Sequence, residues 1–127
     1  MPNQHHILDS KKQQIEASLG GLFADVDQAI AAAMHCLTGK DAAQCQALIQ
    51  GDIRLNDKRR LIEQDCLVAI ASQQPVAHDL RDLVADMHIA AELERMGDHA
   101  RDIAANVLDL NGLSRDTTGQ EDILAMA

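Results

Sequence analysis

Three carboxylates, Glu94, Asp98 and Asp102, stand at strict four-residue steps in the stretch ELERMGDHARDIA, residues 92–104. On a helix this spacing places them on one face, where like charges at i and i+4 destabilise the helix by a few tenths of a kcal/mol per pair. A bound cation would offset that repulsion, and a face fully exposed to water would weaken it. Other residues of the chain are needed to distinguish a metal site from a solvated acidic face.

Asp52 and Asn56 repeat the four-residue step nearer the middle of the chain, where Asp52 interrupts an otherwise apolar pattern. A carboxylate at such a position costs stability unless something pairs with it. Arg59 or another nearby cation would serve, and so would a metal held jointly with Glu94 and Asp98. Carboxylate and amide oxygens suit hard or borderline cations such as Mg, Mn or Fe. The residues alone leave the ion pair and the metal site open.

The elements that must position these side chains are helices, because apolar residues recur at alternating three- and four-residue steps. A first seam stops at Thr38-Gly39, where glycine suits a helix end, and it contains Ile15, Leu19, Leu22, Val26, Ala29, Ala33 and Cys36. Asp41 can cap the next helix, which ends near Ser72 because Gln74 precedes a proline. The second seam contains Cys45, Leu48, Asp52, Leu55, Arg59, Ile62, Cys66 and Ala69.

A third helix begins at Pro75 or at an Asp79 cap and runs to about Leu110, where Asn111-Gly112 closes it. Its expected core stripe is Ile89, Leu93, Met96, Ala100, Ile103, Val107 and Leu110. Short connections make consecutive helices antiparallel, so the sequence predicts an all-α, up-down-up three-helix bundle. Asp52 precedes the turn at 73–75 by nearly as many residues as Glu94 follows it, so the two should lie at one level.

The third helix also carries a second apolar stripe, formed by Leu80, Val84, Met87 and Ala91 and continued by Glu94 and Asp98. Such a face needs cover, either from the same bundle or from a second chain, and we expect a homodimer. At the start of this helix Asp79 should cap or support the first turn. Arg81 should tie that turn to an acidic residue on a neighbouring helix.

Composition narrows the functional classes. The net charge of −9 makes nucleic acid and anionic membranes poor partners, and no run approaches the roughly 18 apolar residues of a transmembrane segment. Cys36, Cys45 and Cys66 lack metal or redox spacing, so we expect reduced core cysteines in a cytoplasmic protein. No phosphate-binding loop, metalloprotease motif or nucleophile–base spacing occurs, so we expect a protein that is not an enzyme.

Three ordered stretches, QGDIRLN (50–56), QQPVAHDLRDLV (73–84) and ELERMGDHARDIA (92–104), together resemble the PhoU family of phosphate transport accessory proteins. The family's acidic motif lies in a Leu-Glu-Arg-Ile-Gly-Asp context, matched here from Leu93 to Asp98. The resemblance implies a PhoU-like or spectrin-like bundle. It also implies a negative regulator that couples the ATPase of a phosphate-importing ABC transporter to a sensor histidine kinase.

PhoU-like proteins bind multinuclear metal clusters through these acidic motifs, so the resemblance implies Fe, Mn, Mg or Zn as cofactors. Glu94 and Asp98 match the motif on the third helix, Asp52 and Asn56 match its counterpart on the second, and Asp102 is a weaker contributor. Asn56 departs from the Asp that many relatives carry, and removes one negative charge. The alternative function is a metal-free helical scaffold or dimerisation module without a role in phosphate signalling.

The chain also departs from the resemblance in length, because family members usually contain two tandem three-helix repeats. Residues 1–112 would form one repeat, and residues 113–127 would form a polar linker and a short apolar stub. Either the chain is a naturally short member that dimerises, or it is a piece of a longer protein.

Overall fold

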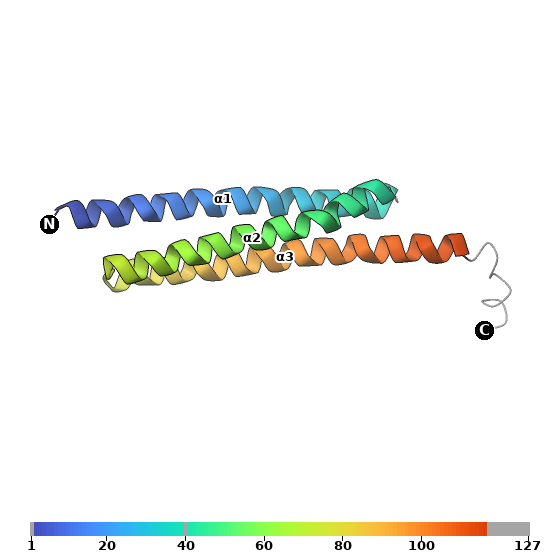
Figure 1. Ribbon diagram of the computed structural model, residues 1–127. Helices are drawn as coiled ribbons and strands as arrows, with labels where there is room; N and C mark the ends of the chain where they lie inside the picture. Colours follow the sequence, from blue (N-terminus) through green and yellow to red (C-terminus); the bar gives the residue numbers. More distant parts are fainter. Residues whose placement is uncertain (1, 40, 117–127) are drawn as a thin grey trace.

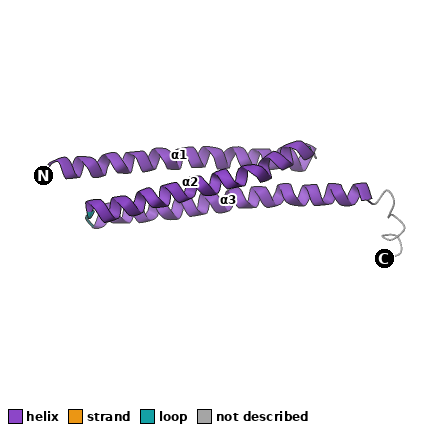
Figure 2. Ribbon diagram, viewed as in Figure 1, coloured by secondary structure: helices purple, strands orange, loops and turns teal. Residues whose placement is uncertain are grey.

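The computed structural model describes residues 2–39 and 41–116, with the side chains of residues 6–39 and 41–110. It contains three helices, α1 (Pro2–Gly39), α2 (Ala42–Gln73) and α3 (Ala77–Asp116). They form an elongated bundle in which each helix packs against both others (Figure 1). The turns are short, so consecutive helices run antiparallel (Figure 2). The predicted all-α, up-down-up three-helix bundle is confirmed.

The start of α2 is fixed by Asp41, as the sequence predicts. Its carboxylate accepts hydrogen bonds from the backbone N–H groups of Ala43 at 3.1 Å and Gln44 at 3.3 Å. These groups have no partner within the helix, so the cap stabilises the first turn by about 0.5–2 kcal/mol.

The end of α2 is set by Gln74 and Pro75. Gln74 adopts a left-handed backbone with a φ of 46°, and its N–H donates to the carbonyl of Ile70 at 3.3 Å. Pro75 has no N–H with which to continue the helical ladder. The helix therefore ends at Gln73, next to the end predicted at Ser72.

The seams predicted for the first two helices form the core. All of the α1 seam is buried except Ala29, which is half-buried. In α2 the polar seam positions Asp52 and Arg59 are half-buried, as is Leu48, while the remaining seam residues are buried. One long cluster joins the three helices and includes Leu8, Ile15, Leu22, Val26, Leu55, Ile62, Leu83 and Leu93.

The core stripe predicted for α3 is partly wrong. Ile89, Met96 and Leu110 are 47 %, 44 % and 61 % exposed, whereas the predicted Leu93, Ala100 and Val107 are buried. Relative to the prediction, α3 is rotated about its axis, and its buried face is completed by small residues, namely Ala90, Gly97 and Ala104. Small side chains let neighbouring helices approach closely, and a prediction weighted toward large apolar residues does not detect them.

The outer surface carries exposed apolar side chains on all three helices, including Phe23, Ile53 and Leu67. Of the second stripe predicted on α3, Leu80, Val84 and Ala91 are exposed, and Met87 packs against the core of the same chain. This stripe is therefore partly covered within the bundle, and the homodimer stays a prediction. Within the described residues, no helix combines the length and the hydropathy that a membrane span requires.

The third helix is longer than predicted, because it continues through Asn111-Gly112 and ends at Asp116. A single glycine costs a helix about 1 kcal/mol relative to alanine, which does not by itself end it. The proposed division at residue 112 therefore falls inside a helix. Most of the predicted linker and stub, residues 117–127, lies outside the described residues.

The expectation of three reduced cysteines is wrong for two of them. Cys36 and Cys45 form a disulfide with their Cα atoms 5.5 Å apart, and both side chains are buried. The bond joins the last turn of α1 to the first turn of α2, because the intervening turn folds the chain back on itself. Cys66 is free and buried, as predicted.

Candidate functional site between α2 and α3

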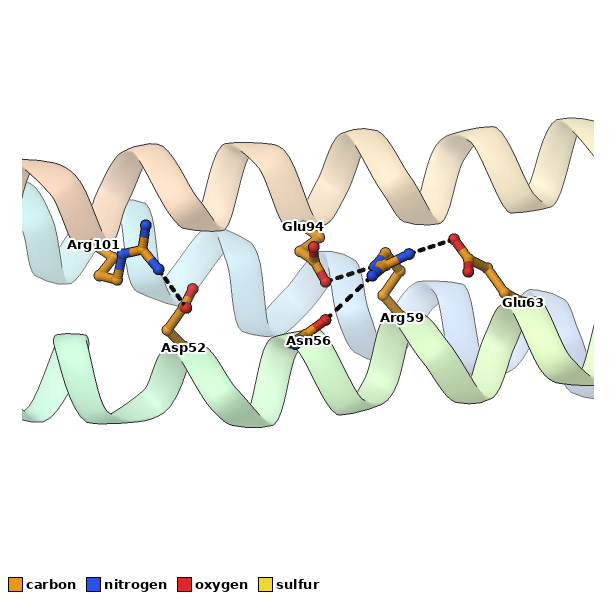
Figure 3. A network of polar contacts seen from close by, with 6 residues as sticks. All are labelled: Asp52, Asn56, Arg59, Glu63, Glu94 and Arg101. Carbon is orange, nitrogen blue, oxygen red and sulfur yellow. Dashed lines mark hydrogen bonds and ion pairs between the residues drawn. The ribbon is translucent and has the colours of Figure 1, made fainter.

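The antiparallel pairing of α2 with α3 brings the two predicted acidic pairs to one level. Asp52 and Asn56 project from α2 toward the part of α3 that carries Glu94 and Arg101 (Figure 3). All four side chains belong to half-buried residues. We call this row of polar side chains, together with Arg59, Glu63 and Asp98, the polar strip.

Arg59 lies at the centre of one half of the polar strip. Its guanidinium donates through Nε to Glu94 at 2.6 Å, through one terminal nitrogen to Glu63 at 2.7 Å, and through the other to Asn56 at 3.3 Å (Figure 3). The hydrogen bonds to Glu94 and Glu63 raise the pKa of Arg59. All three guanidinium nitrogens are thus engaged by oxygens from α2 and α3.

Arg101 has the corresponding position in the other half of the polar strip. It reaches across from α3 to Asp52 at 2.7 Å and also contacts the exposed Asp102 at 3.2 Å. The hydrogen bond to Asp102 and the charge of Asp52 raise the pKa of Arg101. The half-buried seam carboxylate therefore has a cationic partner, which is Arg101 and not Arg59. The Oδ1 atom of Asp52 is buried and receives no hydrogen bond from the described residues.

Asp98 lies beside Asp52 and differs from the other acids of the strip. Burial raises the pKa of Asp98, and the nearby Asp52 carboxylate raises it further, with a smaller contribution from Glu94. Arg101 lowers the same pKa by stabilising the charged form. This part of the strip concentrates negative charge that one guanidinium only partly compensates.

The strip does not fit a metal ion in this arrangement. Within the described residues, no three Asp, Glu, His or Cys side chains come together in a way that could hold one. The residues implied as metal ligands are Asp52, Asn56, Glu94, Asp98 and Asp102. Four of them, all except Asp98, accept a hydrogen bond from Arg59 or Arg101 within the described part of the chain. The predicted metal site thus stays a prediction, with a donor set that two arginines already use.

Asp79 and Arg81 lie at the beginning of α3. The helix begins at Ala77, so Asp79 lies within the first turn and not at the cap position. It is 3 % exposed and pairs with Lys12 of α1 at 2.7 Å, which raises the pKa of that lysine. Arg81 is exposed and forms no ion pair with the described residues, so its predicted tie to a neighbouring helix has no support.

Sequence reasoning missed that every pair of helices is joined by an ion pair. Lys12 joins α1 to α3 through Asp79, and Lys58 joins α2 to α1 through Asp25. The Arg59 and Arg101 contacts join α2 to α3. Lys58 and Arg59 are neighbours in α2. Their places on or next to the second seam were the available indication that they point toward other helices.

The fold and the polar strip define an all-α bundle whose three helices are joined by cross-helix ion pairs. Comparison with known proteins gives the family, because the PhoU domain model matches residues 20–107. The chain belongs to the PhoU family. No solved structure shows a significant match to it.

Curated relatives agree with this family. The phosphate-specific transport system accessory protein PhoU homolog of Rhizobium meliloti is 33 % identical over 113 residues, which cover 84 % of this chain and 46 % of that protein. The homolog of Clostridium acetobutylicum is 34 % identical over 107 residues, 84 % of this chain and 49 % of that protein. The homolog of Streptococcus pneumoniae serotype 4 is 35 % identical over 102 residues, 80 % and 47 % respectively. The chain spans about half the length of these relatives.

Proposed function

We propose that the chain acts as a regulatory adaptor in phosphate transport, and that it is not an enzyme. The observation that carries this proposal is the match of residues 20–107 to the PhoU domain. It is supported by relatives that are named phosphate-specific transport system accessory proteins. The proposed partners are the ATPase of a phosphate ABC transporter and a sensor histidine kinase, both engaged on the cytoplasmic side of the membrane. The proposed effect is negative regulation of the response to phosphate starvation.

The shape of the bundle supports a role in binding proteins. Long helices held in register by ion pairs on each contact present extended and rigid surfaces, and exposed apolar side chains such as Phe23 and Ile53 lie on them. Leu80 and Val84 of α3 are likewise exposed, and a second bundle packed on α3 would cover them. We propose that a second copy of the chain supplies it, as a homodimer.

The alternative is a helical scaffold with no role in phosphate signalling. The pairing of Glu94 and Asp52 with arginines favours a scaffold without metal, because these carboxylates then need no metal ion as a partner. It does not separate a signalling adaptor from a passive scaffold. Binding to the transporter ATPase separates them.

The test is a binding measurement between the purified chain and the purified ATPase subunit of a phosphate transporter from the same organism. We expect saturable binding, detected by biolayer interferometry, and no binding to the ATPase of an unrelated ABC transporter. A full-length PhoU relative with its own ATPase serves as the positive control. The same measurement is made with the sensor kinase. If the chain binds neither the ATPase nor the sensor kinase while the control binds, the adaptor role is overturned.

A further inference from the structure

The polar strip contains its own cations. The side chain of Arg59 is 24 % exposed and that of Glu94 is 17 % exposed, so their contact is shielded from water to a large extent. Arg59 is also bonded to Glu63 and Asn56. A guanidinium remains charged at every physiological pH and directs its N–H groups in a fixed plane. Arg59 thus supplies a permanent positive charge at the place where oxygens from both helices converge.

Arg101 supplies a second permanent positive charge in the other half of the polar strip, where it contacts Asp52 at 2.7 Å and Asp102 at 3.2 Å. A divalent metal entering either half would have to displace charge-assisted hydrogen bonds, which are about twice as strong as neutral ones. It would also lie beside a fixed positive charge, which reduces the local attraction for a second cation. Within the described residues, no three Asp, Glu, His or Cys side chains are grouped so that they could hold a metal ion.

We infer that Arg59 and Arg101 take the place of metal ions as the counter-charges of the polar strip, so that this chain folds and keeps α2 against α3 without a bound metal. Arg59 is a positioning residue that fixes Glu94 and Glu63, and Arg101 fixes Asp52. This assignment disagrees with the metal clusters that the family resemblance implies. It does not depend on the proposed adaptor function.

The first test uses the unmodified chain. It is purified without chelator from cells grown with added Fe, Mn, Mg and Zn, and its metal content is measured by plasma mass spectrometry. The thermal midpoint is then measured after chelation and after each metal is returned. We expect far less than one metal per chain and an unchanged midpoint. Stoichiometric metal, with a midpoint that falls on chelation and recovers with metal, would overturn the inference.

The second test removes one guanidinium. Arg59→Gln should lower the midpoint in metal-free buffer, because Glu94 and Glu63 lose their partner. The matched control is Arg60→Gln, which removes the same charge from the next, exposed residue of α2 and should change the midpoint little. The difference in thermal midpoint between the two variants should shrink in high salt, because salt screens the repulsion between the unpaired carboxylates Glu94 and Glu63.

Equal midpoints for Arg59→Gln and Arg60→Gln would show that the guanidinium is not the counter-charge. If Arg59→Gln does not fold, Arg101→Gln takes its place in the same comparison, with Asp52 as the carboxylate that loses its partner. The metal measurement on the unmodified chain decides the inference even if neither variant can be purified.

Discussion

Gly97, between the motif residues Glu94 and Asp98, allows a prediction whose size follows from the packing. A Cβ atom at position 97 would lie 2.6 Å from Cδ1 of Leu55 and 3.9 Å from Cγ2 of Val26. Carbon atoms prefer separations of about 3.5–4.0 Å, so Leu55 would have to move by about 1 Å. It is 7 % exposed and packs within the main core cluster, which limits that movement.

Two opposing contributions set the effect of Gly97→Ala. Replacing glycine by alanine inside a helix stabilises it by about 0.5–1 kcal/mol. Overpacking a filled core costs about 1–3 kcal/mol. The variant should therefore range from nearly neutral to about 2 kcal/mol less stable than the unmodified chain.

Gly51→Ala is the matched control, since Gly51 lies inside α2 and its added Cβ would meet nothing within 4 Å among the described residues. It should keep the whole gain of about 0.5–1 kcal/mol. The two variants should thus differ by about 1–3 kcal/mol in the free energy of unfolding. Urea denaturation followed by far-ultraviolet circular dichroism measures that difference.

A double variant isolates the cause. Leu55→Val shortens the side chain that meets the new Cβ, so it should cost less in the Gly97→Ala background than alone, a coupling that a double-mutant cycle reports. Equal stability of Gly97→Ala and Gly51→Ala, or a cycle without coupling, would show that Leu55 accommodates the added Cβ atom at no cost.

Three further predictions follow from other contacts. Asp79→Asn removes the ion pair with Lys12 and should lower the free energy of unfolding by about 1–3 kcal/mol, whereas equal stability in urea would show that the pair contributes nothing. Burial, with the charges of nearby acids, raises the pKa of Asp86, so the carboxyl binds its proton more tightly in the folded chain than in the unfolded one. The free energy of unfolding therefore falls as the pH rises from the pKa of the unfolded carboxyl to the pKa of the folded one. Asp86→Asn should therefore be more stable than the unmodified chain at pH 7 and equal to it below about pH 3.9, and a constant difference across pH would contradict this. Reduction of the Cys36–Cys45 disulfide should lower the free energy of unfolding by about 2–3 kcal/mol, as expected for a short closed loop, and an unchanged melting midpoint in dithiothreitol would show that the bond does not constrain the unfolded chain.

The fold was predictable because the information that specifies it is local and periodic. The seams containing Leu22 and Ile62 follow heptad spacing, and Asp41 and Pro75 mark the turns with residue types that act on their own backbone. The rotation of α3 was not predictable in the same way. It depends on Ala90, Gly97 and Ala104 allowing close approach, which is a property of the neighbouring helices as much as of α3.

The candidate site was predicted in position but not in chemistry. Equal distance from the α2–α3 turn placed Asp52 opposite the region of Glu94. Which cation lies between them depends on side-chain reach across the helix pair, and spacing along one helix does not encode that. Likewise, the spacing of Cys36 and Cys45 resembles no redox motif, and the turn between them brings the two sulfurs together.

The proposed regulation of phosphate transport by this chain is tested most directly in cells. Expression of a phosphate-starvation reporter is measured in phosphate-rich medium in a strain of the source organism that lacks the coding segment for this chain, with and without the chain restored from a plasmid. Negative regulation by the chain predicts high reporter expression in the deletion strain and low expression once the chain is restored. Low reporter expression in the deletion strain, equal to that of the parent strain, would contradict it.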